Sequence, residues 1–336
     1  MNRNNFKNFV GLFAILTVVF SSIFWTYKYF FGRPSHLDSS SVKTIDSRED
    51  STKRVDVFYF VDDSSALSTC VSVASVLKNV SKDRKINFHF IHLDDNKMSQ
   101  ENISKFESLK TSIRDFNINY ISFDSSRISG FDNQHWHKSI SVKLFVPSLF
   151  SNLQKVLWLD HDVILTKGID ELYDRDLTGK YIAAIDMSRY FNKYYGGHNC
   201  NSPYWINAGI GLYNLQELRK DNIEEKLINC AKTYNSKNLL KKEKGKMLGG
   251  IEEYALTNVI KKEKALLLPY RYGVMCFFDN FGTGHFKSEE KEIKNNVALH
   301  FCGPCKPWKG KSGILPYYYE FWDYYFKLTP YYKHID

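Results

Sequence analysis

The sequence predicts an α/β domain with a mostly parallel central sheet and helices on both faces. From Val55 onward, short β-branched and apolar runs alternate with segments of helical periodicity, which is typical of successive βα units. Acidic pairs follow two of the expected strands, and ligands of such sheets bind where parallel strands end. With 336 residues, 43% of them hydrophobic, the chain can bury one large core or two modest ones.

The expected elements follow in order from Val55. We expect strands at 55–61, 86–92, 118–121, 156–159 and 181–185, and helices at 67–77, 99–109 and 139–150. Ser99, three residues before Asn102, marks the start of the second helix, and Pro147 is expected to break the third. Parallel strands joined by these helices would bring their carboxyl ends to one edge of the sheet.

The N-terminal segment is predicted to anchor the chain in a membrane. Residues 8–27 carry no charge and are long enough to cross a bilayer core of about 30 Å as a helix. A cleaved signal peptide is the alternative, but the apolar stretch is long and Phe24, Trp25 and Tyr27 replace a small-residue cleavage site. We expect a cytoplasmic tail at 1–7, a signal anchor at 8–31, a flexible stem at 32–54 and the folded domain at 55–336.

Basic residues flank the anchor almost equally, so the orientation depends on other clues. Asn79-Val-Ser81 and Asn102-Ile-Ser104 are N-glycosylation sequons and agree with a lumenal domain. We therefore expect a single-pass type II protein of the Golgi or ER membrane. The net charge of +9 includes a lysine group at 237–246, expected to be a solvated loop, and no nucleic-acid motif accompanies it. No nucleic-acid partner is expected.

Six cysteines permit disulfides in an oxidising compartment. Cys302-Gly-Pro-Cys305 is a C-x-x-C pair, for which a redox or zinc role has to be considered. No second pair completes a zinc site, and Cys70 lies in an apolar helical stretch. Structural or packed cysteines are the favoured interpretation.

Acidic residues at the expected strand ends are the first candidates for a functional site. Asp160-His161-Asp162 directly follows the strand at 156–159, and Asp62-Asp63 follows the first strand. Two carboxylates one residue apart can bind a divalent cation, which in turn can hold a diphosphate. The chain has neither G-x-G-x-x-G after the first strand nor a P-loop, so metal and side chains would have to hold phosphates.

Four motifs in order carry a resemblance to a known family. They are Asp62-Asp63-Ser64, LWLDHD at 157–162, INAGIGLYNL at 206–215 and HFCGPCKPW at 300–308. This combination resembles glycosyltransferase family 8, the retaining sugar transferases that include bacterial lipooligosaccharide galactosyltransferases and glycogenin. The resemblance covers about three quarters of the chain. It implies a Rossmann-like, GT-A type nucleotide-diphospho-sugar transferase fold, with the catalytic domain at 55–336.

The resemblance also implies a metal and its ligands. The ligands of a Mn²⁺ ion would be Asp160, Asp162 and His300, with the diphosphate of a UDP-sugar completing the shell. Manganese accepts imidazole with carboxylate and phosphate oxygens, which magnesium and calcium seldom do. Lys306 would neutralise a phosphate oxygen as UDP departs. His161 lies in the LWLDHD motif and Gly303 in the HFCGPCKPW motif, so the resemblance places both in the cofactor-binding site.

Further site residues follow from the same resemblance. Asp62 and Asp63 would bind uracil or ribose, with a cap for the following helix as the alternative. Asn207-Ala208-Gly209 is similar to the segment beneath the donor sugar. Asp186, at the end of the strand at 181–185, resembles an acidic residue that contacts a sugar, and a solvated strand end is the alternative.

Two departures from the family pattern concern the sugar. Where the family usually has D-Q-D, this chain has Glu252-Glu253-Tyr254, so Glu252 keeps the first carboxylate on a longer arm and Tyr254 loses the last. Lys143 stands where the family commonly has an arginine, which exchanges a planar fork for a point charge. The metal and nucleotide residues are therefore closer to the family pattern than the sugar residues.

The resemblance implies transfer of a hexose or pentose from a UDP-sugar to a glycan or glycoprotein acceptor, with retention at the transferred carbon. The favoured mechanism is same-face attack through an oxocarbenium-like transition state, with Glu252, Asn207 and Asp186 as catalytic residues. A nucleotide-sugar hydrolase is one alternative. A catalytically weak relative that binds glycans or a partner protein is the other, and the altered Glu252–Tyr254 stretch permits it.

Overall fold

The computed structural model describes residues 53–131, 138–188, 202–236, 250–276, 290–303, 306–310, 314 and 316–332. The expected tail and anchor, nearly all of the expected stem, the lysine group and Cys305 lie outside these residues. Within the described ranges, no helix is both long and apolar enough to cross a membrane. All of the described residues belong to one compact unit, Asp50–Asp336.

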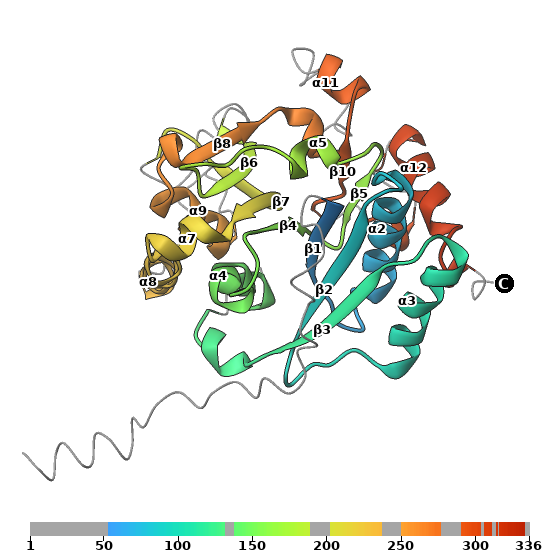
Figure 1. The fold of residues 1–336 in the computed structure, drawn as a ribbon, viewed down its shortest axis with the longest axis horizontal. Coiled ribbons are helices and arrows are strands. Elements are labelled where there is room, and N and C mark those ends of the chain that lie inside the picture. Colours follow the sequence, from blue (N-terminus) through green and yellow to red (C-terminus); the bar gives the residue numbers. More distant parts are fainter. Residues whose placement is uncertain are drawn as a thin grey trace, which may run out of the picture. The chain divides into compact units, whose positions relative to one another are not determined.

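A seven-stranded sheet forms the centre of this unit, in the order β3-β2-β1-β4-β7-β6-β8 (Figure 1). The strands are β1 (Arg54–Phe60), β2 (Lys85–Leu93), β3 (Asn117–Phe123), β4 (Lys155–Leu159), β6 (Ile182–Asp186), β7 (Ile206–Asn214) and β8 (Ala265–Leu268). β3, β2, β1 and β4 are parallel, as are β6 and β8, whereas β7 is antiparallel to both of its neighbours. The expected mostly parallel sheet is confirmed, and β7 begins where β4 ends.

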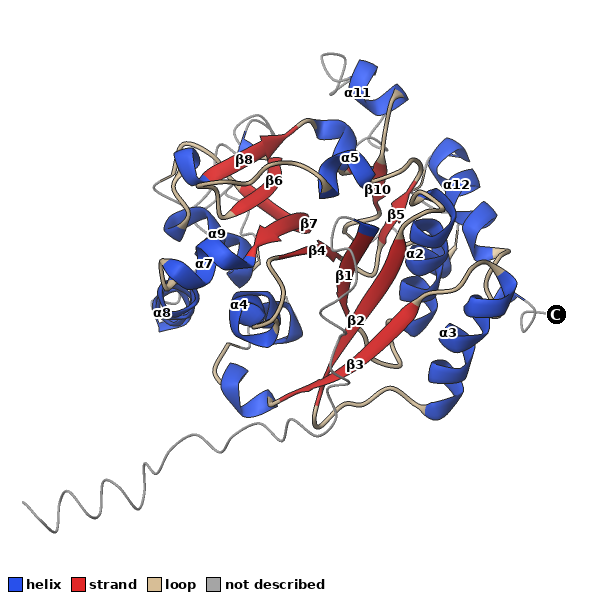
Figure 2. Ribbon diagram, viewed as in Figure 1, coloured by secondary structure: helices blue, strands red, loops and turns tan. Residues whose placement is uncertain are grey.

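Helices cover both faces of the sheet, as expected (Figure 2). On one face, the Phe90 ring of β2 lies 4.8 Å from Phe106 of α3 (Gln100–Ser112). On the other, the Phe58 ring of β1 lies 5.3 Å from Phe150, which directly follows α4 (Val146–Leu149). Neighbouring side chains of a strand point to opposite faces, so the apolar runs of β1 and β2 feed both layers.

The remaining helices are α2 (Ala66–Asn79), α5 (Asp170–Tyr173), α7 (Leu215–Lys220), α8 (Ile223–Ser236), α9 (Ile251–Val259), α11 (Glu290–Lys294) and α12 (Pro316–Phe326). The prediction of one helix at 139–150 broken by Pro147 is wrong. Lys138–Phe145 forms a 3₁₀ helix, η4, and Pro147 lies in the first turn of α4. A proline fits there because the first backbone N–H groups of a helix have no partner within it.

A small second sheet brings a distant segment to the end of β4. Its strands β5 (Val163–Leu165), β10 (Ala298–His300) and β9 (Val274–Met275) lie in the order β5-β10-β9. β10 is antiparallel to β5, with His300 paired to Val163. Because β5 starts directly after Asp162, this register places His300 beside the acidic motif.

The side chains of both sequon asparagines are half-buried and hydrogen-bonded to other residues. Asn79 Nδ2 donates to the Tyr325 hydroxyl at 2.7 Å and to the carbonyl oxygen of Leu165 at 3.1 Å. Asn102 Nδ2 donates to Asp63 Oδ1 at 2.8 Å. A glycan on either nitrogen would displace these hydrogen bonds.

Four of the six cysteines fall in the described ranges: Cys70, Cys230, Cys276 and Cys302. Cys70 and Cys276 are buried, which agrees with the expectation of packed cysteines. Burial raises the pKa of the Cys70 thiol well above its usual range, and that of Cys302 likewise. Both are therefore protonated at neutral pH and poor nucleophiles.

Candidate functional site

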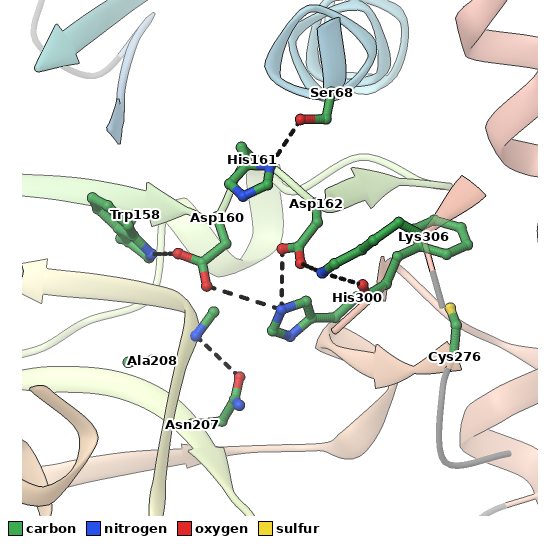
Figure 3. A network of polar contacts seen from close by, with 12 residues as sticks. Ser68, Trp158, Asp160, His161, Asp162, Asn207, Ala208, Cys276, His300 and Lys306 are labelled. Carbon is green, nitrogen blue, oxygen red and sulfur yellow. Dashed lines mark hydrogen bonds and ion pairs between the residues drawn. The ribbon is translucent and has the colours of Figure 1, made fainter. Parts of the chain in front are cut away.

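Asp160, Asp162 and His300 converge on one point, as the sequence predicted (Figure 3). Each offers a ligand atom within 4.8 Å of the others. His300 Nε2 lies 3.2 Å from Asp162 Oδ1 and 3.9 Å from Asp160 Oδ2. We refer to these three residues as the metal cluster. The two aspartates come from the turn after β4 and the histidine from β10, so both sheets are needed to build it.

The donor atoms of the metal cluster suit a divalent cation. Asp162 and His300 are buried, and Asp162 Oδ1 and His300 Nδ1 have no hydrogen-bond partner among the described residues. Two carboxylates with one imidazole form a set that manganese, iron or zinc accepts more readily than magnesium or calcium. The residues present therefore fit a metal site.

Lys306 supplies a positive charge beside the metal cluster. Its Nζ contacts Asp162 Oδ2 at 2.5 Å and donates to the carbonyl oxygen of Phe301 at 2.7 Å. Burial alone would raise the pKa of Asp162, but Lys306 and then His300 outweigh burial and hold that pKa well below its usual range. Gly303, with φ of +78°, makes the left-handed turn between His300 and Lys306 that glycine adopts most readily.

Gly209 leaves room for the His300 ring. A Cβ at this position would lie 2.2 Å from His300 Cε1 and 2.6 Å from Nδ1. The carbonyl oxygen of Gly209 accepts a hydrogen bond of 2.8 Å from Asp160 N, which ties β7 to the acidic turn. Glycine is therefore required for close approach of the strand to the metal cluster.

Lys143 links the metal cluster to the start of α9. This side chain is 2% exposed, and its Nζ lies 2.8 Å from Asp160 Oδ1, 2.8 Å from the Ala208 carbonyl oxygen and 3.6 Å from Glu252 Oε1. Burial would lower the pKa of Lys143, but Asp160 and Glu252 outweigh that effect and raise it. Trp158 Nε1 also donates to Asp160 Oδ1, at 2.7 Å.

Residues 56–312 match the family model described as glycosyl transferase family 8. The chain belongs to glycosyltransferase family 8. It is 27% identical over 262 residues to a putative glycosyltransferase of Haemophilus influenzae, covering 73% of this chain and 70% of that protein. Probable galacturonosyltransferase 13 of Arabidopsis thaliana is 24% identical over 206 residues, which are 54% of this chain and 36% of that protein.

A solved structure of the galactosyltransferase LgtC, in complex with donor and acceptor sugar analogues, has the same fold. Its TM-score is 0.64 at 20% sequence identity, and the match covers 82% of this chain and 96% of that one. This likeness confirms the GT-A-like α/β architecture.

His161, the middle residue of the family 8 acidic motif, turns away from the metal cluster (Figure 3). Its Nδ1 lies 2.8 Å from Ser68 Oγ of α2, and its ring lies 5.8 Å from that of Trp308. Lys306 Nζ is in turn 5.6 Å from the centre of the Trp308 ring. The side chain of His161 therefore joins three segments around the site and does not point at the cluster.

Asp62 and Asp63 accept hydrogen bonds from other residues of the chain in this structure. Asp62 Oδ1 accepts from the backbone N of Ser65 at 2.9 Å, and Asp63 Oδ1 accepts from the backbone N of Ser99 at 2.8 Å. Asp62 is buried and Asp63 is exposed. Asp62 therefore holds Ser65, the residue directly before α2, whereas Asp63 contacts the start of α3 and does not cap the helix that follows it. The pair lies at the carboxyl end of β1, beside β4.

Asp186 ends β6 and accepts two backbone hydrogen bonds at one oxygen. Oδ1 receives N–H groups from Ser188 at 2.9 Å and from Trp205 at 3.0 Å. This carboxylate therefore fixes the chain on both sides of residues 189–201, which lie outside the described residues.

Asn207 and Ala208 are held by a residue that sequence reasoning missed, Glu253. Glu253 Oε1 accepts from Ala208 N at 3.1 Å and from Asn207 Nδ2 at 3.2 Å, and Oε2 accepts from Trp205 Nε1 at 3.1 Å. These donors lie 45 to 48 positions earlier in the chain. No local sequence pattern around Glu253 predicts these hydrogen bonds, and the only signal in the sequence is its position next to Glu252.

Glu252 lies beside Lys143 in the first turn of α9. It is 5% exposed, and its Oε2 has no hydrogen-bond partner among the described residues. Burial, opposed by Lys143 and assisted by Glu253, raises the pKa of Glu252 to about 7. Gly250 makes room for this carboxylate, because a Cβ there would lie 2.3 Å from Oε2. We refer to Glu252 and Glu253 as the glutamate pair.

The strand order sets these groups side by side along one edge of the sheet. The acids after β1 come first, the metal cluster after β4 second, the start of β7 with the glutamate pair third, and Asp186 after β6 last. Ile206 of β7 pairs with Asp186, and Ile210 pairs with Leu159 of β4. The site is therefore a row that can take an elongated ligand.

Proposed function

We propose that this family 8 chain transfers a hexose or pentose from a UDP-sugar to a glycan or glycoprotein acceptor, with retention. The observation that carries the proposal is the metal cluster with Lys306, placed between the acids after β1 and the start of β7. In that order the nucleoside would lie over β1, the diphosphate at the cluster and the sugar over β7. This is the sequence of parts in a UDP-sugar.

The bound metal is proposed to be Mn²⁺, held by Asp160, Asp162 and His300. A divalent ion there would act as a Lewis acid and stabilise charge on the departing diphosphate. Lys306, next to Asp162, is placed to neutralise a phosphate oxygen at the same time.

Retention is proposed to arise from same-face attack: the acceptor oxygen bonds to the anomeric carbon as the bond to UDP breaks, and a β-phosphate oxygen of the departing UDP takes the acceptor proton. Both carboxylates nearest the start of β7 are engaged by the protein, since Glu253 accepts three hydrogen bonds and Glu252 lies against Lys143. In this proposal Glu252 Oε2, which has no hydrogen-bond partner among the described residues, accepts a hydrogen bond from the donor sugar, with Asn207 and Asp186 as the other catalytic residues. A sugar covalently bound to Glu252 in a mass spectrum would contradict this mechanism.

The donor is proposed to be a UDP-hexose or UDP-pentose, and the names of relatives suggest two hexose classes. LgtC is named a galactosyltransferase and the Arabidopsis protein a probable galacturonosyltransferase. These sugars differ at C6, which is a hydroxymethyl carbon in one and a carboxylate carbon in the other. The charge of the donor sugar is therefore the first question about specificity.

The test combines calorimetry with product analysis on the full chain. UDP with Mn²⁺ should bind, and chelation of the metal should remove binding. UDP-sugars incubated with glycan acceptors should give a glycosylated product with retained configuration. Free sugar with every acceptor would instead indicate a hydrolase, and absence of UDP binding would indicate a non-catalytic relative.

We also propose that residues 8–31 anchor the chain in the Golgi or ER membrane, with the catalytic domain in the lumen. Their uncharged, apolar composition supports this proposal. Deletion of residues 1–31 should release the protein from the membrane fraction, and retention of the truncated chain there would contradict it.

A further inference from the structure

We infer that the donor sugar carries no carboxylate, so that it is a neutral hexose or a pentose and not a uronic acid, and that the glutamate pair sets this preference. The inference rests on the proposed function and narrows its substrate class. It follows from the charges, burial and hydrogen bonds at the start of β7 and α9.

The first observation is a group of acids where the sugar would lie, with Glu252 buried and Glu253 and Asp160 partly buried. Glu252 is 5% exposed, and Glu253 accepts hydrogen bonds from Ala208 and Asn207, the same segment that borders the metal cluster. Asp160 lies on the other side of Lys143 from Glu252. A uronate carboxylate would be repelled by the ionised forms of these acids, and burial beside Glu252 would add the cost of desolvating its own charge.

The second observation concerns the positive charge nearby. Lys143 donates to the Ala208 carbonyl oxygen and lies 2.8 Å from Asp160 and 3.6 Å from Glu252, so three acceptors already surround its ammonium group. In the described part of the chain, no other lysine or arginine forms an ion pair with the glutamate pair. A uronate carboxylate would therefore have to compete with these three acceptors for Lys143.

The third observation is the buried oxygen of Glu252 that has no hydrogen-bond partner in the described residues. A carboxylate accepts hydrogen bonds, and a buried acceptor without a donor is costly. A sugar hydroxyl can donate to it. An ionised carboxylate at C6 has no hydrogen to donate, so replacing a hydroxymethyl group by a carboxylate removes a donor and adds repulsion.

The test needs no variant. The full chain with Mn²⁺ is titrated calorimetrically with UDP, UDP-galactose and UDP-galacturonic acid, a donor pair that differs only at C6. Because UDP-glucose differs from UDP-galactose at C4 alone, it serves as a second neutral donor. We expect UDP-galacturonic acid to bind at least about tenfold more weakly than the tighter of the two neutral donors.

The outcomes separate the inference from the proposed function. Equal affinities, or tighter binding of UDP-galacturonic acid, would overturn the inference while the binding of UDP leaves the proposed function intact. If UDP itself fails to bind with Mn²⁺, the proposed function fails and the inference falls with it.

Variants then assign the preference to residues. Glu252→Gln removes the carboxylate and supplies an amide donor. The dissociation constant of UDP-galacturonic acid divided by that of the tighter neutral donor should therefore fall at least about threefold. Glu171→Gln makes the same change at an exposed residue of α5 and should leave the ratio unchanged. An unchanged ratio in a folded Glu252→Gln protein would overturn the assignment to Glu252.

Discussion

The metal cluster and the glutamate pair lie at the same edge of the sheet, yet their acids are in opposite electrostatic states. Lys306 and His300 hold the pKa of Asp162 well below its usual range against the effect of burial. Burial instead raises the pKa of Glu252 to about 7, even with Lys143 at 3.6 Å. Burial alone therefore does not decide what an acid can do, because the number and engagement of nearby cations decide it.

This difference indicates that the two regions suit different kinds of ligand. Asp162 is ionised at neutral pH and suits a cation, whereas Glu252 suits hydrogen-bond donors such as hydroxyl groups. Lys143 contacts Asp160 on one side and Glu252 on the other, so it is shared between the two regions.

Removing Lys143 should have the largest effect on stability, because this residue contacts both the metal cluster and the glutamate pair. Lys143→Met leaves Asp160 and Glu252 without their shared cation, and loss of one partner of a buried ion pair costs about 3–5 kcal/mol of folding free energy. Chemical denaturation of the metal-free protein measures it. Lys155→Met, a half-buried lysine packed over Tyr173, is the control and should cost less. Equal losses in the two variants would contradict the sharing of Lys143.

Asp162→Asn tests the metal cluster alone. It removes a ligand charge and the partner of Lys306, so metal-dependent turnover should fall about 10²–10³-fold. Rates of UDP-sugar cleavage with saturating Mn²⁺ measure the effect. Asp323→Asn, on α12 and paired with Lys327, is the control and should retain activity. Unchanged turnover in Asp162→Asn would show that the metal binds elsewhere.

Gly209→Ala tests the geometry of the metal cluster without changing its charge. The new Cβ would lie 2.2 Å from His300 Cε1, so the ring must move and metal affinity should fall about 10–100-fold. Gly211→Ala is a matched control two residues along β7, because its nearest neighbour would be 3.4 Å away. Titration of Mn²⁺ in the presence of UDP compares the two. Similar metal affinities would refute the close-approach role of Gly209.

Glu252→Gln tests the glutamate pair through pH. The pKa of Glu252 rises from 4.5 to about 7 on folding, so the wild type loses stability as pH increases between these values. A glutamine does not titrate, so the stability of Glu252→Gln relative to the wild type should rise from pH 5 to pH 8. Denaturation midpoints of the metal-free proteins report it. A difference that is constant with pH would mean that Glu252 ionises normally.

Ser68→Ala should have the smallest effect. It removes the hydrogen bond to His161, worth about 0.5–1.5 kcal/mol of stability, and leaves every atom of the metal cluster in place. UDP affinity with Mn²⁺ should change by less than about threefold. A loss of tenfold or more would mean that the anchoring of His161 controls the cluster.

The parts of the site that could be predicted from the sequence were those with a local signature. Asp160 and Asp162 follow a buried strand one residue apart, and His300 lies in a motif with Gly303 and Lys306. The βα alternation likewise predicted β1 to β4, because each strand and helix there has its own periodicity.

The missed features depend on contacts between distant segments. Glu253 gains its role from Trp205, Asn207 and Ala208 on another strand, and His161 from Ser68 on α2. Hydrophobic patterns also left open that the 206–214 segment runs antiparallel to β4. Only that direction puts Gly209 against Asp160, and strand direction is set by connections and tertiary packing.

The engagement of Asn79 and Asn102 has a practical consequence for any study of orientation in the membrane. If a folded lumenal domain keeps these hydrogen bonds, removal of N-glycans will leave its gel mobility unchanged, as for a cytoplasmic one. Asp176→Asn would instead create a sequon with Leu177 and Thr178, in which positions 176 and 178 are both exposed. Asparagine can keep the acceptor oxygen that bonds Thr178, at 2.8 Å to its backbone N, while its Nδ2 is available for a glycan. A mobility shift in that variant would report on which side of the membrane the domain folds.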